Sequence, residues 1–345
     1  LEPIPLMEQH GADALRWFML ASGAPWQNRR VGHTILQEIV RKVLLTFWNT
    51  VAFHTLYARA GGWTPDESAP PVAQRPLLDR WLLAELNQLV VGVDAALDRY
   101  DPTLAGRLLS QFIDDLSNWY VRRSRRRFWS GDPAALATLH TSLETLTRLL
   151  APMVPFIPER VWQDLVRPVT PDAPESVHLA SWPQADPALA DPKLSEQMAL
   201  VRRLIELGRA TRATAAVRTR QPLGQALVGA AGFAELPAEL RAQIADELNV
   251  LSVAALGEMG SDLVDYTVKA NFRALGRRFG SGTQPVAAAI AAADPATVAA
   301  DLREHGSTTV TVNGAQVSVG VDEVVVTESP REGWAVESAA GETVA

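Results

Sequence analysis

The strongest constraint on the fold is a series of long segments in the first half of the chain whose apolar side chains recur with a helical period. In the segment of about 33–60, the periodic positions are Ile35, Ile39, Val43, Thr46, Phe47 and Val51, and the pattern ends at a glycine pair, 61–62. The same period predicts helices at 11–22, about 77–99, 103–127, about 133–150 and about 156–166. Short polar connections join these helices, so the pattern predicts an antiparallel helix bundle.

Two of these helices begin with a clear start signal. Asp101 precedes Pro102, and Asp132 precedes Pro133. An aspartate at the N-cap accepts hydrogen bonds from the first free backbone N–H groups, and proline fits the first helical position. A proline-rich connector spans 64–76, and the proline-rich, aperiodic stretch 168–192 marks the expected domain boundary.

The second half of the chain has a mixed pattern. It predicts a helix at about 193–217, extended runs at 225–230, 248–256 and 263–269, and alanine-rich helices over about 285–304. Residues 308–327 alternate with period two around Asn313-Gly314, which predicts a hairpin. We therefore expect a mainly α protein: a junction over 1–32, an antiparallel helix bundle over 33–185 and a smaller α+β domain over 192–345.

Composition excludes several classes of protein. The chain has 345 residues with 47% hydrophobic content, enough for two or three domains with cores of their own. No apolar run reaches the roughly 18 residues of a membrane span, and the first ten residues are unlike a signal peptide. The sequence thus predicts a soluble, cytoplasmic protein. It contains no cysteine, and its six histidines show no ligand spacing, so we expect no metal site.

The charge of the chain is unevenly distributed. The net charge is −7, and residues 286–345 carry all of it, with nine acidic residues against two arginines. Residues 122–127 nevertheless contain five arginines, with aromatic residues on both sides. On a continuous α-helix, one face would carry Trp119, Arg122, Arg123 and Arg126, with Tyr120 and Arg127 on its flank and Trp129 beyond. Arginine suits phosphates and aromatic faces suit unstacked bases, so this run favours RNA binding.

A plainer interpretation of the arginine run stays open. The arginines could be a solvated helix end that complements the helix dipole, and the aromatic residues could be core anchors. The sequence shows no catalytic constellation. Asp114 and Asp115 fit ion pairs with the arginines better than acid–base catalysis, and His33 and His54 lie within apolar helical periodicity, as core or boundary histidines do.

Several motifs resemble one family. GADALRW at 11–17 with FMLASGAPW resembles the segment after the catalytic signature loop of class I aminoacyl-tRNA synthetases of the isoleucyl, valyl and leucyl group. The motifs LDRW at 78–81, LSNWYVRRSRRRFW at 116–129, APMVPFIPERVWQDL at 151–165 and SVHLASWP at 176–183 resemble that group's helical anticodon-binding domain, in the family's order. The motifs VRTRQPL at 217–223, ELNV at 247–250 and VKANFRALGRRFG at 268–280 resemble the C-terminal region of isoleucyl-tRNA synthetases of the eukaryotic-like type.

The resemblance implies a function and a partner. It implies an internal piece of an isoleucyl-tRNA synthetase that binds the anticodon arm of tRNA, as a monomer, with the rest of the synthetase as its other partner. The family's two nucleotide-binding signatures, His-x-Gly-His and Lys-Met-Ser-Lys-Ser, are absent. We therefore expect no cofactor or catalytic residue in this chain, while ATP and magnesium would serve the parent enzyme. A valyl-tRNA synthetase region and a non-catalytic helical protein-interaction module remain alternatives.

The expected tRNA contacts follow from the same motifs. Those of the helical domain are Trp119, Tyr120, Arg122, Arg123, Arg126, Arg127 and Trp129. Arg29 and Arg30 lie where the resemblance places contacts with the inner stem and the junction to the catalytic domain. In the C-terminal region, Arg218, Arg220, Arg273, Arg277 and Arg278 lie in turn-like surroundings that could meet the anticodon-stem side, although a purely structural role stays open.

Overall fold

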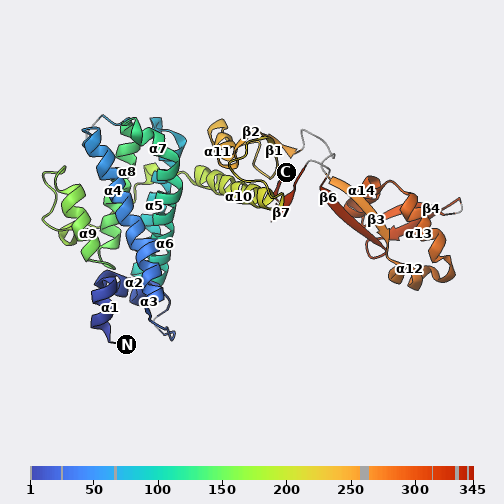
Figure 1. The fold of residues 1–345 in the computed structure, drawn as a ribbon, viewed down its shortest axis with the longest axis horizontal. Coiled ribbons are helices and arrows are strands. Elements are labelled where there is room, and N and C mark those ends of the chain that lie inside the picture. Colours follow the sequence, from blue (N-terminus) through green and yellow to red (C-terminus); the bar gives the residue numbers. More distant parts are fainter. Residues whose placement is uncertain are drawn as a thin grey trace. The chain divides into compact units, whose positions relative to one another are not determined.

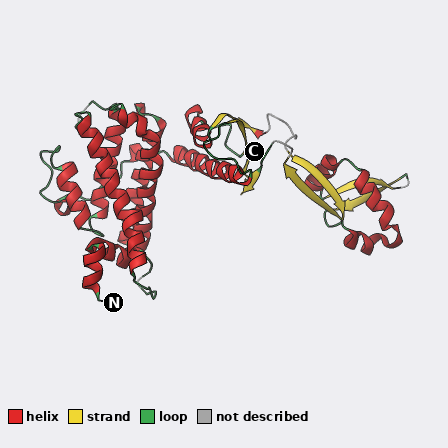
Figure 2. Ribbon diagram, in the orientation of Figure 1, coloured by secondary structure: helices red, strands yellow, loops and turns green. Residues whose placement is uncertain are grey.

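The computed structural model describes residues 2–24, 26–65, 68–256, 264–312, 314–330, 334–339 and 342–345. The chain divides into two compact units, Leu1–Glu196 and Gln197–Ala345. The first unit is helical, and the second combines helices with strands (Figures 1 and 2). The expected fold class, a helix bundle followed by a smaller α+β region, is confirmed.

The first unit is an up-and-down arrangement in which α4, α5, α6 and α8 lie side by side (Figure 1). Its α-helices are α1 (Pro3–His10), α2 (Ala12–Ala21), α3 (His33–Ile39), α4 (Leu45–Ala60), α5 (Leu77–Asp98), α6 (Pro102–Asp114), α7 (Arg122–Trp129), α8 (Pro133–Leu150) and α9 (Phe156–Val161). Only α1 was not expected from the sequence. The core consists of the apolar faces of these helices, including the fully buried Trp81, Phe47 and Leu109.

Both predicted start signals are confirmed. The Asp101 carboxylate accepts a hydrogen bond from the Leu104 backbone N–H at 2.9 Å. The Asp132 carboxylate accepts from the N–H groups of Ala134 and Ala135, at 2.9 and 3.2 Å. Each aspartate satisfies N–H groups that have no partner within the helix, and so fixes where α6 and α8 begin.

Three helical segments that the sequence predicts as continuous contain π-helical turns. These turns span Val40–Leu44, Asp115–Val121 and Trp162–Val166. A π turn holds more residues than an α turn, so the side chains beyond it leave the face that a continuous α-helix would give them. The second of these turns lies directly before the arginine-rich α7, and it changes which residues of that segment are exposed.

Close contact between α2 and α6 depends on a glycine. A Cβ atom at Gly106 would lie 2.3 Å from the Cβ of Ala21, which is shorter than any real contact between two carbon atoms. The helices therefore approach each other at Gly106 because it has no side chain. Helix α2 is also attached to the start of α9. The Asp13 carboxylate of α2 accepts hydrogen bonds from the backbone N–H groups of Phe156 and Ile157 at 3.3 and 2.8 Å.

The second unit contains the strands. Its elements are α10 (Pro192–Thr214, which begins in the first unit), β1 (Leu223–Gly229), α11 (Ala238–Leu248), β2 (Val250–Ala255), β3 (Val264–Ala270), α12 (Phe272–Phe279), α13 (Thr283–Ala292), α14 (Pro295–His305), β4 (Ser307–Val312), β5 (Ala315–Gly320), β6 (Val324–Pro330), β7 (Glu337–Ala339) and β8 (Glu342–Val344). One sheet has the order β2-β1-β8-β7, with β1 and β2 parallel. The pairs β3–β6 and β4–β5 are antiparallel.

Only part of the alternating stretch 308–327 forms the predicted hairpin. Its first two parts form the expected hairpin of β4 and β5, with Val312 opposite Ala315, while Asn313 of its turn lies outside the described residues. The third part of that stretch, β6, pairs instead with the distant β3. Helices α13 and α14 pack on β3 and β4 and bury the apolar side chains of Leu275, Ile290 and Val319.

Candidate nucleic-acid interface

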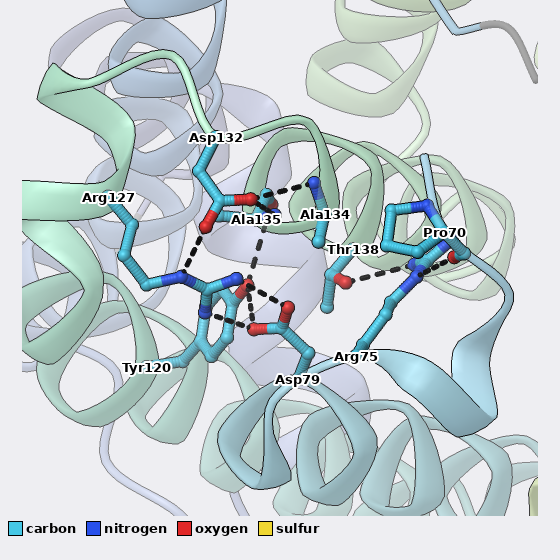
Figure 3. A network of polar contacts seen from close by, with 9 residues as sticks. All are labelled: Pro70, Arg75, Asp79, Tyr120, Arg127, Asp132, Ala134, Ala135 and Thr138. Carbon is cyan, nitrogen blue, oxygen red and sulfur yellow. Dashed lines mark hydrogen bonds and ion pairs between the residues drawn. The ribbon is translucent and has the colours of Figure 1, made fainter. Parts of the chain in front are cut away.

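Helix α7 is held in the bundle by a buried ion pair between Arg127 and Asp79 of α5 (Figure 3). Asp79 is fully buried, and its two carboxylate oxygens accept hydrogen bonds from the two terminal nitrogens of Arg127 at 2.6 and 2.7 Å. The Nε of Arg127 donates to Asp132 at 2.7 Å, and the Tyr120 hydroxyl donates to Asp79 at 2.9 Å. Asp132, which caps α8, therefore also holds α7 through its hydrogen bond with Arg127.

The protonation states in this network support the ion pair. Burial alone would lower the pKa of Arg127, but the hydrogen bonds that it donates to Asp79 and Asp132, together with the charge of Asp79, outweigh burial and raise that pKa above the ordinary value. Burial would raise the pKa of Asp132, but the hydrogen bond and charge of Arg127, together with the backbone N–H groups of Ala135 and Ala134, outweigh burial and lower that pKa. Burial, with the nearby charge of Asp79, raises the pKa of the Tyr120 hydroxyl well above its ordinary value. Arg127 stays charged and Tyr120 stays neutral.

A second arginine fixes the proline-rich connector to the same end of α8. The Nε of Arg75 donates to the Pro70 carbonyl at 2.9 Å, and its Nη1 donates to the Thr138 hydroxyl at 3.0 Å (Figure 3). Thr138 lies on α8 and is fully buried. The connector between α4 and α5 is therefore attached to the bundle next to the Asp79 network.

The structure corrects the expected RNA-facing surface at three positions. Tyr120 has no exposed surface and Trp119 is only 8% exposed, so neither can offer a ring face to a base. Arg127 uses its donors on Asp79 and Asp132 within the bundle. The π-helical turn Asp115–Val121 is the physical reason, because it directs Trp119 and Tyr120 inward and rotates α7 relative to a continuous helix. Arg123 is half-buried, with its guanidinium 4.9 Å from the centre of the Trp119 ring.

The exposed side of α7 instead consists of Arg122, Arg125, Arg126 and Trp129, which we call the α7 stripe. Their spacing, i, i+3, i+4 and i+7, places them on one helix face. Trp129 is 63% exposed, and its indole N–H donates to the Tyr57 hydroxyl at 2.9 Å. Arg122 donates from Nε to the Asn118 carbonyl at 2.9 Å. Sequence reasoning missed Arg125; counting helical spacing back from Trp129 would have found it.

The two arginines near the N-terminus differ in role. Arg29 donates to the carbonyls of Phe18 and Met19 at 3.0 and 3.1 Å, and its guanidinium lies 5.5 Å from the centre of the Phe18 ring. It therefore holds the end of α2. Arg30 is exposed, and the neighbouring Trp26 is 85% exposed. Of this pair, Arg30 is the one that is open to a ligand.

The arginines expected in the second unit are mostly exposed. Arg218 and Arg220 lie in the segment between α10 and β1, in turn-like surroundings as expected. Arg273, Arg277 and Arg278 lie on α12, so the expectation of a turn there is wrong. Asn271 caps this helix, because its side chain accepts from the Ala274 N–H at 3.4 Å. Arg278 is paired with Glu323 at 2.8 Å.

In the described part of the chain, no group of three or more histidine, cysteine, aspartate or glutamate side chains has an arrangement that could hold a metal ion. Among the described helices, none is both long and apolar enough to cross a membrane.

The comparisons with known proteins show which class of protein this helical bundle resembles. Residues 79–227 match the family described as the anticodon-binding domain of tRNA ligase. The expected resemblance of this chain to isoleucyl-tRNA synthetases is thereby confirmed.

The relatives are isoleucine–tRNA ligases. Those of Streptomyces avermitilis and Thermobifida fusca are 65% and 64% identical over all of this chain, and each match covers 33% of the relative. That of Thermus thermophilus is 45% identical over 81% of this chain and 27% of the relative. The chain thus spans about a third of the length of the curated relatives that it matches.

Proposed function

We propose that this chain is the tRNA(Ile)-binding portion of an isoleucine–tRNA ligase and that it recognises the anticodon arm. The observation that carries the proposal is the α7 stripe, three exposed arginines in line with an exposed tryptophan on a helix within the matched residues 79–227. Its parent enzyme would use ATP and magnesium outside this chain. We further propose that the parent enzyme is a monomer in the cytoplasm.

The chemistry of the α7 stripe suits a single-stranded loop. The deep major groove of an A-form RNA helix is closed to side chains, so sequence is read from unstacked bases in loops. Guanidinium groups pair with phosphates, and the exposed face of Trp129 can stack on a base. The hydrogen bond from Trp129 to Tyr57 holds the indole edge and leaves the ring exposed.

The position of the α7 stripe depends on the buried ion pair. Arg127 points into the bundle from the opposite side of α7 and binds Asp79, so its neighbours Arg125 and Arg126 face outward. The exposed Arg30 in the first unit, and Arg218, Arg220, Arg273 and Arg277 in the second unit, are further proposed contacts with tRNA phosphates. Arg123 and Arg278 are weaker proposed contacts, because each already lies over an aromatic ring nearby in the sequence, Trp119 and Phe279 respectively.

The test is tRNA binding by the chain over a range of salt concentrations. Arg125→Gln with Arg126→Gln should weaken binding, and each lost phosphate contact should reduce the log–log salt slope by about 0.7. The matched control is Arg99→Gln with Arg167→Gln, two exposed arginines of the first unit outside α7. Wild-type affinity and slope in the α7 variant would contradict the proposal and favour the solvated helix end. Binding of acidic proteins in place of tRNA would favour the interaction module.

A further inference from the structure

The second unit contains a pocket of about 340 Å³ that includes no residue of the α7 stripe. It lies where the last turns of α10 meet the sheet of β1, β2 and β8. Most of its wall is apolar and comes from distant parts of the chain: Leu223, Leu248, Val250, Trp334 and Val344. A volume of this size falls at the lower end of the range for small-molecule sites.

Among the described residues, one charged side chain lines this pocket, Arg212 in the last turn of α10. It is only 5% exposed. Its Nη2 donates to the backbone carbonyls of Arg218 and Thr219 at 3.0 and 3.2 Å and also to that of Gln221. Its Nε and Nη1 are buried, and within the described residues neither has a hydrogen-bond partner. One of the three guanidinium nitrogens is therefore satisfied by the segment between α10 and β1, and the other two have no partner among the described residues.

The positive charge of Arg212 also has no carboxylate partner among the described residues. The two neighbouring arginines of the same helix do have one, since Arg203 pairs with Glu342 and Arg209 pairs with Glu247. Burying a charge without a counter-ion, and N–H groups without acceptors, costs free energy. Neutral carbonyls at one nitrogen offset only part of that cost, so the arrangement favours an anion in the pocket.

We propose that this pocket binds a small organic carboxylate with an apolar body. The carboxylate accepts hydrogen bonds from the free N–H groups of Arg212, and the body contacts Leu223, Leu248 and Trp334. A single negative charge matches the single guanidinium, because the described lining holds no second cationic side chain to balance a phosphate dianion. Charge-assisted hydrogen bonds of this kind are stronger than those between neutral groups.

The experiment is calorimetric titration of the whole chain with 4-methylpentanoate and with its neutral amide, 4-methylpentanamide. The two probes have the same apolar body and differ in charge. We expect the carboxylate to bind at least about tenfold more tightly than the amide, as loss of a hydrogen bond to a charged group predicts. Arg212→Gln should remove this preference, whereas Arg241→Gln, at an exposed position on α11, should preserve it.

A second variant is needed because Arg212 also holds the segment 215–222, so that loss of binding in Arg212→Gln must be separated from loss of structure. Ala215 is exposed at the rim of the pocket, so Ala215→Trp should block the entrance and abolish carboxylate binding with Arg212 intact. Circular dichroism checks that each variant is folded. Equal affinity for the two probes, no saturable binding of either, or unchanged binding in Ala215→Trp would overturn the proposal. None of these readouts involves tRNA, so they are independent of the proposed function.

Discussion

Asp79 and Arg127, 48 residues apart, form a buried, bidentate ion pair that joins α5 to α7. Asp79 has no exposed surface, while the Arg127 side chain is 24% exposed. The carboxylate is therefore stable in the core only because Arg127 and Tyr120 supply three hydrogen bonds to it. The ion pair also determines which side of α7 faces outward.

Breaking this ion pair should destabilise the first unit strongly. We expect Arg127→Met to lower the free energy of unfolding by about 3–5 kcal/mol, because it leaves the Asp79 charge buried and unpaired. The double variant Asp79→Leu with Arg127→Met should lose less than the single variant, because no charge is then left in the core. Urea denaturation measures both. Equal or greater loss in the double variant would show that the ion pair does not act as a unit.

Trp129→Ala should weaken tRNA binding by roughly 1–3 kcal/mol if the indole stacks on a base. The salt slope should stay nearly unchanged, because no phosphate contact is lost. Tyr57→Phe is the matched control, since it removes only the hydrogen bond that holds the indole edge. Unchanged affinity in Trp129→Ala, in a protein with a normal thermal melt, would exclude stacking by this residue.

Acid should destabilise the first unit through two buried histidines. Burial, with the charge of His140 as a smaller cause, lowers the pKa of His54 to about 3, and burial lowers that of His140 to about 4, from an ordinary 6.5. The folded state holds both rings neutral, so only the unfolded state takes up protons as the pH falls below about 6.5. Stability is therefore complete above pH 6.5 and is lost progressively toward pH 4, by about 2 kcal/mol per histidine between pH 7 and 5.

Urea denaturation at a series of pH values tests this histidine effect. His140→Gln should make the pH dependence about half as steep between pH 7 and 5, because one of the two groups no longer titrates. His178→Gln, an exposed histidine outside the bundle core, should leave the dependence unchanged. A wild-type protein that is equally stable at pH 7 and pH 5 would show that the two rings are not held neutral.

Gly106→Ala should destabilise the packing of α2 on α6 by about 1–3 kcal/mol, the usual cost of overpacking. The added methyl group would lie 2.3 Å from the Cβ of Ala21. Ala21→Gly in the same chain should recover part of the loss, because it removes the atom that clashes. Thermal melts of the single and double variants measure the effect, and a lack of any recovery would place the strain elsewhere.

The chain alone should not activate isoleucine, because the family's two nucleotide-binding signatures are absent from its sequence. Without these signatures the chain lacks the residues with which the family positions the phosphates of ATP for this chemistry. Isoleucine-dependent pyrophosphate exchange by the purified chain is the measurement. A rate above that of a matched blank would refute the prediction.

Local signals in the sequence predicted most helices of the first unit, two of their starting points and one hairpin. Asp101 and Asp132 act on backbone groups within three residues, so their capping roles can be predicted without knowledge of the fold. The same holds for the β4–β5 turn, where Gly314 has a φ of 81°. The family motifs were also sufficient to predict an anticodon-binding domain, which the comparisons confirm.

Tertiary structure alone decided which parts of those helices are exposed and which distant residues meet. The π-helical turn before α7 buries Trp119 and Tyr120, and the pairing of Arg127 with Asp79 rotates Arg125 into the exposed stripe. Pairing of β6 with β3, rather than with its neighbour β5, likewise depends on how α13 and α14 pack. Capping and periodicity reflect interactions between near neighbours in the chain, whereas these features depend on packing between segments far apart in sequence, which no local pattern encodes.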